Sequence, residues 1–227
     1  GGLFDQGIKD DALYALGFAY FKNEEFDKAA EIINPLAAKA VSEGLGVKSN
    51  YLLGEIYYNL GDFNQAIFFF EQALNRSQDV LVSQKAEYWI ADSLYHIGKG
   101  KEALAKFNAL RSRYPGYPVA AEAAFWLGGY YYQNNQPRLA RRYFLHIIQD
   151  HPDSPLLPEA YYSLALCFMD DSNLQDALDN FNKAFSSGGQ ELKAKSAMAS
   201  GDISLKQGMP DEAEAFYGKA LTCSSKE

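Results

Sequence analysis

The chain contains few residues that could carry catalysis or hold a metal ion. Its 227 residues include two cysteines, Cys167 and Cys223, and three histidines. Two cysteines imply no disulfide framework, and they leave the redox compartment open. His146 and His151 are five residues apart, whereas a metal-binding pair on a helix needs a spacing of four. No set of side chains combines a nucleophile, a base and oxyanion donors. We therefore predict no enzyme activity, no catalytic residue, no metal site and no cofactor.

The chain also lacks an excess of positive charge and any long apolar run. Its formal net charge is −8, which argues against general binding to nucleic-acid phosphates. No apolar run approaches the roughly 18 residues of a membrane span, so no direct membrane insertion is expected. The chain has no initiator methionine and no visible signal peptide. Leu3 and Phe4 lack cover at the start, so we expect a piece of a longer protein, from which a targeting segment could have been removed.

Aromatic residues are abundant, and they belong to an internal repeat. The chain has 16 tyrosines and 15 phenylalanines. Alanines recur at steps of 37, 37, 37, 37 and 36 residues, at Ala29, Ala66, Ala103, Ala140, Ala177 and Ala213. Twelve positions before each alanine lies a small residue, at Gly17, Gly54, Ala91, Gly128, Ala165 and Gly201. Four positions after each alanine lies a large residue, at Ile33, Phe70, Phe107, Phe144, Phe181 and Tyr217. Self-similarity of this kind indicates a repeat protein.

Each repeat is predicted to contain two helices. In the third copy the first helix is expected at about Ala86–Ile97. A glycine that can adopt a left-handed conformation follows the first helix in three copies, at Gly61, Gly98 and Gly208. Asp62 with Gln65 resembles a capping box at the start of a second helix, and Pro137 suits a first helical turn. Proline-bearing links, SRYPGYPVAAEA and QDHPDSPLLPEA, follow the second helices. The stretch EGLGVKS, residues 43–49, is predicted to be a loop rather than a phosphate-binding site.

The repeated pattern resembles the tetratricopeptide repeat. The family's order of Leu-Gly-x-x-Tyr, Ala-x-x-x-Phe and Pro is present over about residues 10–222. The resemblance implies an all-α fold, a right-handed α-solenoid of six helix-turn-helix repeats with a period of about 37 residues instead of the family's 34. The expected repeats are about 10–46, 47–83, 84–120, 121–157, 158–193 and 194–222. Residues 1–9 would be a remnant or the end of a preceding element, and residues 223–227 a tail.

A narrower resemblance concerns the strings EYWIADSLY and AFWLGGYYY and the tyrosine-proline links. They are similar to tetratricopeptide proteins of the bacterial cell envelope, of the Tol-Pal-associated coordinator and barrel-assembly lipoprotein types. This likeness implies the periplasm or cell envelope, with the cytoplasm as the alternative.

The family resemblance implies a function in binding proteins. In such arrays the first helices line a concave groove in which a partner peptide docks. The predicted groove residues are Tyr51, Tyr58, Tyr88, Trp89, Tyr95, Phe125, Trp126, Gly129, Tyr132 and Tyr162. Each tyrosine could instead belong to the framework, and the two tryptophans could instead pack between repeats. We predict a non-enzymatic interaction scaffold for a protein or peptide partner. The alternative is a structural or oligomerisation module of a larger envelope assembly, with self-association.

Two adjacent glycines in the fourth repeat have different predicted roles. Gly128 belongs to the column of small residues, where a larger side chain would push two helices apart. Gly129 belongs to no such column, although each glycine in a helix interior costs about 1 kcal/mol relative to alanine. We hypothesise that Gly129 opens a pit between Phe125 and Tyr132 that accepts an apolar anchor of a partner. Tolerated drift at an exposed position is the alternative.

Overall fold

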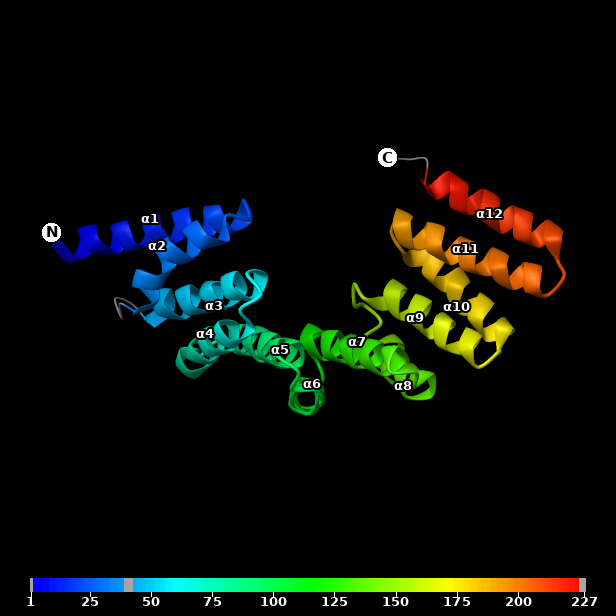
Figure 1. The fold of residues 1–227 in the computed structure, drawn as a ribbon, viewed down its shortest axis with the longest axis horizontal. Helices are drawn as coiled ribbons and strands as arrows, with labels where there is room; N and C mark the ends of the chain where they lie inside the picture. The colour runs from blue at the N-terminus through cyan, green and yellow to red at the C-terminus, as the bar shows by residue number, and fades with distance from the viewer. Residues whose placement is uncertain (1, 39–42, 225–227) are drawn as a thin grey trace. The chain divides into compact units, whose positions relative to one another are not determined.

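The computed structural model of the protein describes residues 2–38 and 43–224, with the side chains of 2–5, 43 and 224 left out. Over these residues the chain forms twelve α-helices and no strand (Figure 1). The predicted all-α fold of paired helices is therefore confirmed. The expectation that Leu3 and Phe4 lack cover concerns side chains outside the described residues.

The helices alternate as the first and second members of six pairs. The first helices are α1 (Gly2–Lys22), α3 (Glu43–Asn59), α5 (Val80–His96), α7 (Pro118–Gln133), α9 (Leu157–Asp170) and α11 (Gln190–Lys206). The second helices are α2 (Phe26–Ala38), α4 (Phe63–Arg76), α6 (Gly100–Arg113), α8 (Pro137–Asp150), α10 (Leu174–Ser187) and α12 (Pro210–Ser224). The chain divides into two compact units, Gly1–Arg113 and Tyr114–Glu227. Within each unit, consecutive helices pack together and each first helix also contacts the next first helix.

Some first helices begin earlier than the sequence predicted. Helix α1 begins at Gly2 and includes residues 2–9, and α5 begins at Val80 rather than at Ala86. The loop prediction for residues 43–49 is wrong, because they form the first turns of α3. The Arg76 side chain packs closely against this part of α3. A Cβ atom on Gly46 would lie only 2.6 Å from Nη2 of Arg76, so glycine leaves room for this contact.

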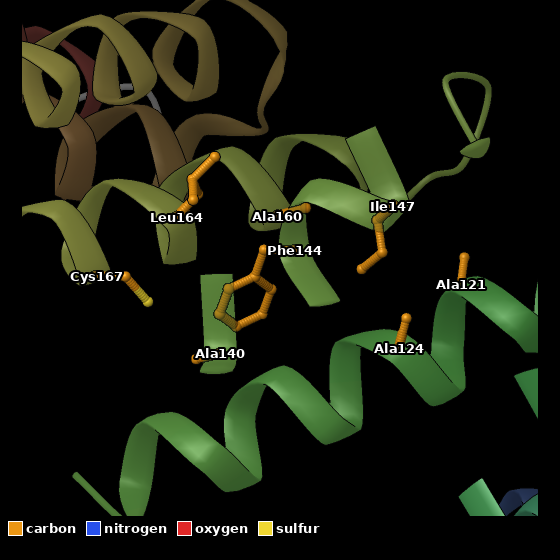
Figure 2. Close-up of a cluster of buried hydrophobic side chains, with 8 residues drawn as sticks. All are labelled: Ala121, Ala124, Ala140, Phe144, Ile147, Ala160, Leu164 and Cys167. Atoms are coloured by element: carbon orange, nitrogen blue, oxygen red, sulfur yellow. The ribbon is translucent and has the colours of Figure 1, made fainter. Parts of the chain in front are cut away.

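The core of each pair is built from the repeated columns. All six column alanines are buried, and Phe70, Phe107, Phe144 and Phe181 are at most 2% exposed. Figure 2 shows the cluster around Phe144 of α8, which includes Ala124 of α7 and Leu164 of α9. The Phe144 side chain of α8 therefore fills the space between α7 and α9.

The column of small residues lets the two helices of a pair cross closely. A Cβ atom on Gly128 would lie 2.5 Å from Cε1 of Phe144, far inside the 3.5–4.0 Å of a favourable carbon contact. An equally short contact, at 2.5–2.6 Å, recurs in the pairs Gly17–Ile33, Gly54–Phe70 and Gly201–Tyr217. The predicted packing role of Gly128 is thereby confirmed.

Each first helix is followed by one residue in the left-handed conformation. Its φ is positive at Glu24 (61°), Gly61 (78°), Gly98 (83°), Asn135 (58°), Ser172 (59°) and Gly208 (75°). The three glycines predicted for this role are confirmed, and three residues with a Cβ atom adopt the same conformation. The predicted starts of second helices are also confirmed. Asp62 Oδ1 accepts from the Gln65 amide at 3.1 Å, and Pro137 is the first residue of α8.

Replacing Ser172 with glycine should stabilise the second unit. A residue with a Cβ atom is strained in the left-handed region, so glycine should raise the free energy of unfolding by about 0.5–1 kcal/mol. Gly208→Ala, at the equivalent position of another pair, should lower it by about 1 kcal/mol. Urea midpoints from circular dichroism test both changes, and a loss of stability in Ser172→Gly would contradict the strain argument.

Candidate functional site

All ten predicted groove residues lie on first helices. They lie on α3 (Tyr51, Tyr58), α5 (Tyr88, Trp89, Tyr95), α7 (Phe125, Trp126, Gly129, Tyr132) and α9 (Tyr162). Tyr95 is 36% exposed, and the other nine are half-buried. Residues of α3 and α5 belong to the first unit, and those of α7 and α9 belong to the second.

One column of these aromatics packs against the core. Tyr51 meets the buried Phe70 edge-on, with ring centroids 5.4 Å apart. The equivalent contact recurs in the pairs Tyr88–Phe107 (5.3 Å), Phe125–Phe144 (5.7 Å) and Tyr162–Phe181 (5.3 Å). Such contacts contribute about 0.5–1.5 kcal/mol beyond the burial of area. These four rings therefore support the framework, and only their remaining surface is open to a partner.

Trp89 packs between two adjacent helix pairs of the first unit. Its ring centroid lies 4.8 Å from that of Tyr58 and 6.4 Å from that of Phe70, which both belong to the preceding pair. Of the two predicted locations, the structure therefore shows the one between repeats for Trp89. Trp126 stacks on Tyr130 of its own helix at 5.6 Å. A role of Trp126 in the groove stays a prediction.

Tyr58 also links successive first helices through a hydrogen bond. Its Oη donates to Oδ2 of the buried Asp92 at 2.5 Å. Nε2 of His96 lies 3.5 Å from the same carboxylate oxygen, and the His96 ring stacks on Phe63 at 4.4 Å. Burial, the hydrogen bond to Asp92 and its negative charge all raise the pKa of Tyr58 well above the usual value. Sequence reasoning did not identify Asp92 and His96 as its partners, because they lie 34 and 38 residues further along the chain.

Tyr132 makes the corresponding link in the second unit. Burial, followed by the charge of Asp170 and a hydrogen bond to it, raises the pKa of Tyr132 to about 12. The neighbouring Asp171 carboxylate pairs with Arg141 at 2.9 Å and with Arg138 at 3.7 Å. The end of α9 is thus tied to both helices of the preceding pair.

The link through Tyr132 predicts a fall in stability at alkaline pH. The folded-state pKa of Tyr132 is raised, so its contribution is fully present below the unfolded value near 10 and is lost as pH rises towards about 12. Between pH 10 and 12 the free energy of unfolding should therefore fall less steeply in Tyr132→Phe than in the wild type. Asp170→Asn should also make the fall of the unfolding free energy with pH less steep, but by less than Tyr132→Phe does. Urea titrations across this range measure the difference, and identical slopes in all three proteins would contradict the prediction.

Charges of both signs lie on the first helices of the first unit. Burial raises the pKa of the Glu55 carboxyl, while Lys22 of α1 and Lys85 of α5 oppose that shift. Glu55 in turn adds to the effect of burial in raising the pKa of Tyr14. Tyrosine rings and charges of both signs therefore lie together on these first helices.

Side chains that bind metal ions do not gather in the described part of the chain. Over residues 2–38 and 43–224, no group of three or more His, Cys, Asp and Glu side chains could hold a metal ion. Cys167 is buried, and burial is the main cause that raises the pKa of its thiol to about 12, so the reactive thiolate is disfavoured. In the same part of the chain, no helix combines the length and apolar character needed to cross a membrane.

Gly129 has open space beside it. Apart from its adjacent residues and the backbone of its own helix, no atom lies within 4 Å of the place that a Cβ atom on this residue would take. On the helix surface its neighbours are Phe125 and Trp126, one turn before, and Tyr132, one turn after. Gly128 is needed for packing, whereas Gly129 is not.

Comparison with known proteins places this architecture in a family. Residues 84–227 match the family model described as a tetratricopeptide repeat-like domain, and residues 47–80 match the model described as a tetratricopeptide repeat. No curated protein sequence matches the chain.

Several solved structures share the fold. Residues 41 to the end of MamA from Desulfovibrio magneticus RS-1 align with a TM-score of 0.60 and 16% identity, covering 80% of this chain and 97% of that one. The apo form of RapI aligns with a TM-score of 0.65 and 13% identity, covering 95% and 97%. The C-terminal part of a tetratricopeptide repeat protein from Cytophaga hutchinsonii aligns with a TM-score of 0.68 and 19% identity, covering 92% and 78%. With a family model matching more than half of its length and helix pairs throughout its described residues, the chain belongs to the tetratricopeptide repeat family.

Proposed function

We propose that this chain is a non-enzymatic scaffold that binds a segment of a partner protein through the aromatic groove residues of its first helices. Tetratricopeptide repeat proteins typically act as scaffolds for protein partners. The segment would be extended or helical, and it would contact the aromatic edges and charges described above. The envelope location implied by the strings around Trp89 and Trp126 is part of the same proposal.

The observation that carries the proposal is the open space at Gly129. Alanine there would touch nothing and would favour the helix by about 1 kcal/mol. A residue that weakens its helix without aiding packing is a candidate for function. An apolar side chain of the partner would occupy this space between Phe125 and Tyr132.

The test compares two glycines that both have open space beside them. Gly129→Leu fills the proposed pit, whereas Gly218→Leu adds the same side chain on α12, where nothing lies within 4 Å either. Proteins captured from native extract by the wild type should also be captured by Gly218→Leu and should be lost with Gly129→Leu. Circular dichroism must show that both variants keep the helical fold. Capture that survives in Gly129→Leu would exclude the pit as an anchor site.

A second candidate function, a structural or oligomerisation module, is favoured by apolar side chains exposed on α1. Leu16 is 46% exposed, whereas its counterparts Leu53 and Leu127 in later repeats are fully buried. Ile8 on the same helix is 56% exposed. Sedimentation equilibrium would show a mass that rises with protein concentration, and Leu16→Asp should abolish the rise. A constant mass over the whole range would exclude this function for α1.

A further inference from the structure

A notch recurs at one register of the repeat, where a link between helix pairs meets the start of the preceding first helix. In the first unit it lies between the start of α3 and residues 76–79, with a volume of about 290 Å³. In the second unit it lies between residues 116–121 and residues 150–155, with a volume of about 280 Å³. A third notch, of about 320 Å³, lies between Glu159 and residues 189–195. The links and helix starts form these notches. Gly129 lines none of them, so they are separate from the proposed pit.

We call the notch at residues 150–155 the acid notch. It combines apolar walls with negative charge. It is lined by Gly116, Tyr117, Pro118, Ala121, Asp150, His151, Pro152, Asp153, Ser154 and Pro155. The Tyr117 side chain is 42% exposed, so its ring is accessible to a partner. None of the lining residues is a lysine or an arginine.

The charge of the acid notch is only partly compensated. Asp150 pairs with Nδ1 of His146. Burial lowers the pKa of His151, and the neighbouring His146 lowers it further against the opposing effect of Asp150, so the charged form of His151 is disfavoured. Asp153 is exposed, and no hydrogen bond or ion pair involves its carboxylate among the described side chains.

The notch of the first unit differs in charge, whereas the third notch, lined by Glu159, Glu191 and Lys195, is also negative on balance. Lys48, Arg76 and Asp79 line the notch of the first unit, where positive side chains outnumber negative ones. In the third notch, Lys195 is bonded to Glu191 at 2.5 Å. The acid notch therefore offers a negative site that the same register in the first unit does not.

We propose that the acid notch binds the guanidinium group of an arginine side chain presented by a partner protein. A planar cation can stack on the Tyr117 ring while its N–H groups donate to the carboxylate of Asp153. The volume, near 280 Å³, lies just below the roughly 300–1,000 Å³ of sites that enclose whole small ligands, so it suits a single side chain. A lysine ammonium would lack both the stacking and the paired donors.

The probe is N-acetyl-arginine methylamide, titrated into the full chain and followed by backbone amide NMR. Saturable shifts are expected at residues 116–121 and 150–155, and none at residues 76–79 of the first unit. The citrulline analogue has nearly the same shape without the charge and should cause no shift. The lysine analogue should bind at least about fivefold more weakly. Equal binding of the citrulline or lysine analogue, or equal shifts at both notches, would overturn the proposal.

Variants show whether the probe binds at the acid notch or is only attracted by the negative charge of the whole protein. Asp153→Asn and Tyr117→Ala should each weaken binding of the probe at least about fivefold. Glu214→Gln removes the same charge from exposed α12 and should leave binding unchanged. Unchanged binding in Asp153→Asn with the fold intact would refute the site. Gly129→Leu should bind the probe like the wild type, so failure of the pit and failure of the acid notch are distinguishable.

Discussion

Replacing Gly128 with leucine is expected to lower the free energy of unfolding of the second unit by about 3 kcal/mol. The first atom of the new side chain already collides, because a Cβ atom would lie 2.5 Å from Cε1 and 2.7 Å from Cζ of Phe144. The Phe144 ring cannot swing aside, since it is 2% exposed and enclosed by the cluster shown in Figure 2. Helix α7 would have to move away from α8, and both helices would lose packing.

The neighbouring glycine provides the control for this prediction. Gly129→Ala should be neutral or should stabilise by up to about 1 kcal/mol, because alanine favours the helix and nothing lies within 4 Å of its Cβ atom. Urea unfolding followed by circular dichroism compares the two variants. Equal losses from both changes would contradict the distinction between the packed and the open glycine.

Replacing Phe144 with alanine is expected to cost about 4 kcal/mol of unfolding free energy. The ring is buried in a cluster that draws side chains from α7, α8 and α9, so its removal leaves a cavity that these helices cannot fully close. Phe125 would also lose the edge-on contact that holds it at 5.7 Å. Urea midpoints of the variant and the wild type measure the loss.

The double variant Gly128→Leu/Phe144→Ala tests whether the two positions share one space. The leucine would occupy part of the volume vacated by the ring. The double variant should therefore lose about 1–2 kcal/mol less unfolding free energy than the two single variants lose together. Strict additivity would show that the collision at Gly128 is not with Phe144.

The features predicted correctly from the sequence are those that arise within one helix pair. Gly128 and Phe144 are 16 residues apart in adjacent helices, and the same pairing recurs along the chain. The repeated column is therefore enough to predict a close crossing. The left-handed glycines and the cap at Asp62 depend only on neighbouring residues, and both were predictable for that reason. The loop prediction for residues 43–49 failed because the glycines weakened the local helix signal, whereas packing by Arg76 supports that helix.

The packing contacts of the aromatic residues on the first helices were decided by tertiary structure. Periodicity placed Tyr88 and Trp89 outside the core face, but it did not show that Tyr88 rests on Phe107 or that Trp89 packs against the preceding pair. The bond from Tyr58 to Asp92 joins residues 34 positions apart, and it requires a particular separation and rotation of two first helices. These quantities depend on how neighbouring pairs pack, which no single helix encodes. The sequence by itself therefore determined the repeat and the crossing within each pair. Three-dimensional packing decided the rest, because contacts within a pair hold rings such as Tyr88 and contacts between pairs hold Tyr58 and Trp89.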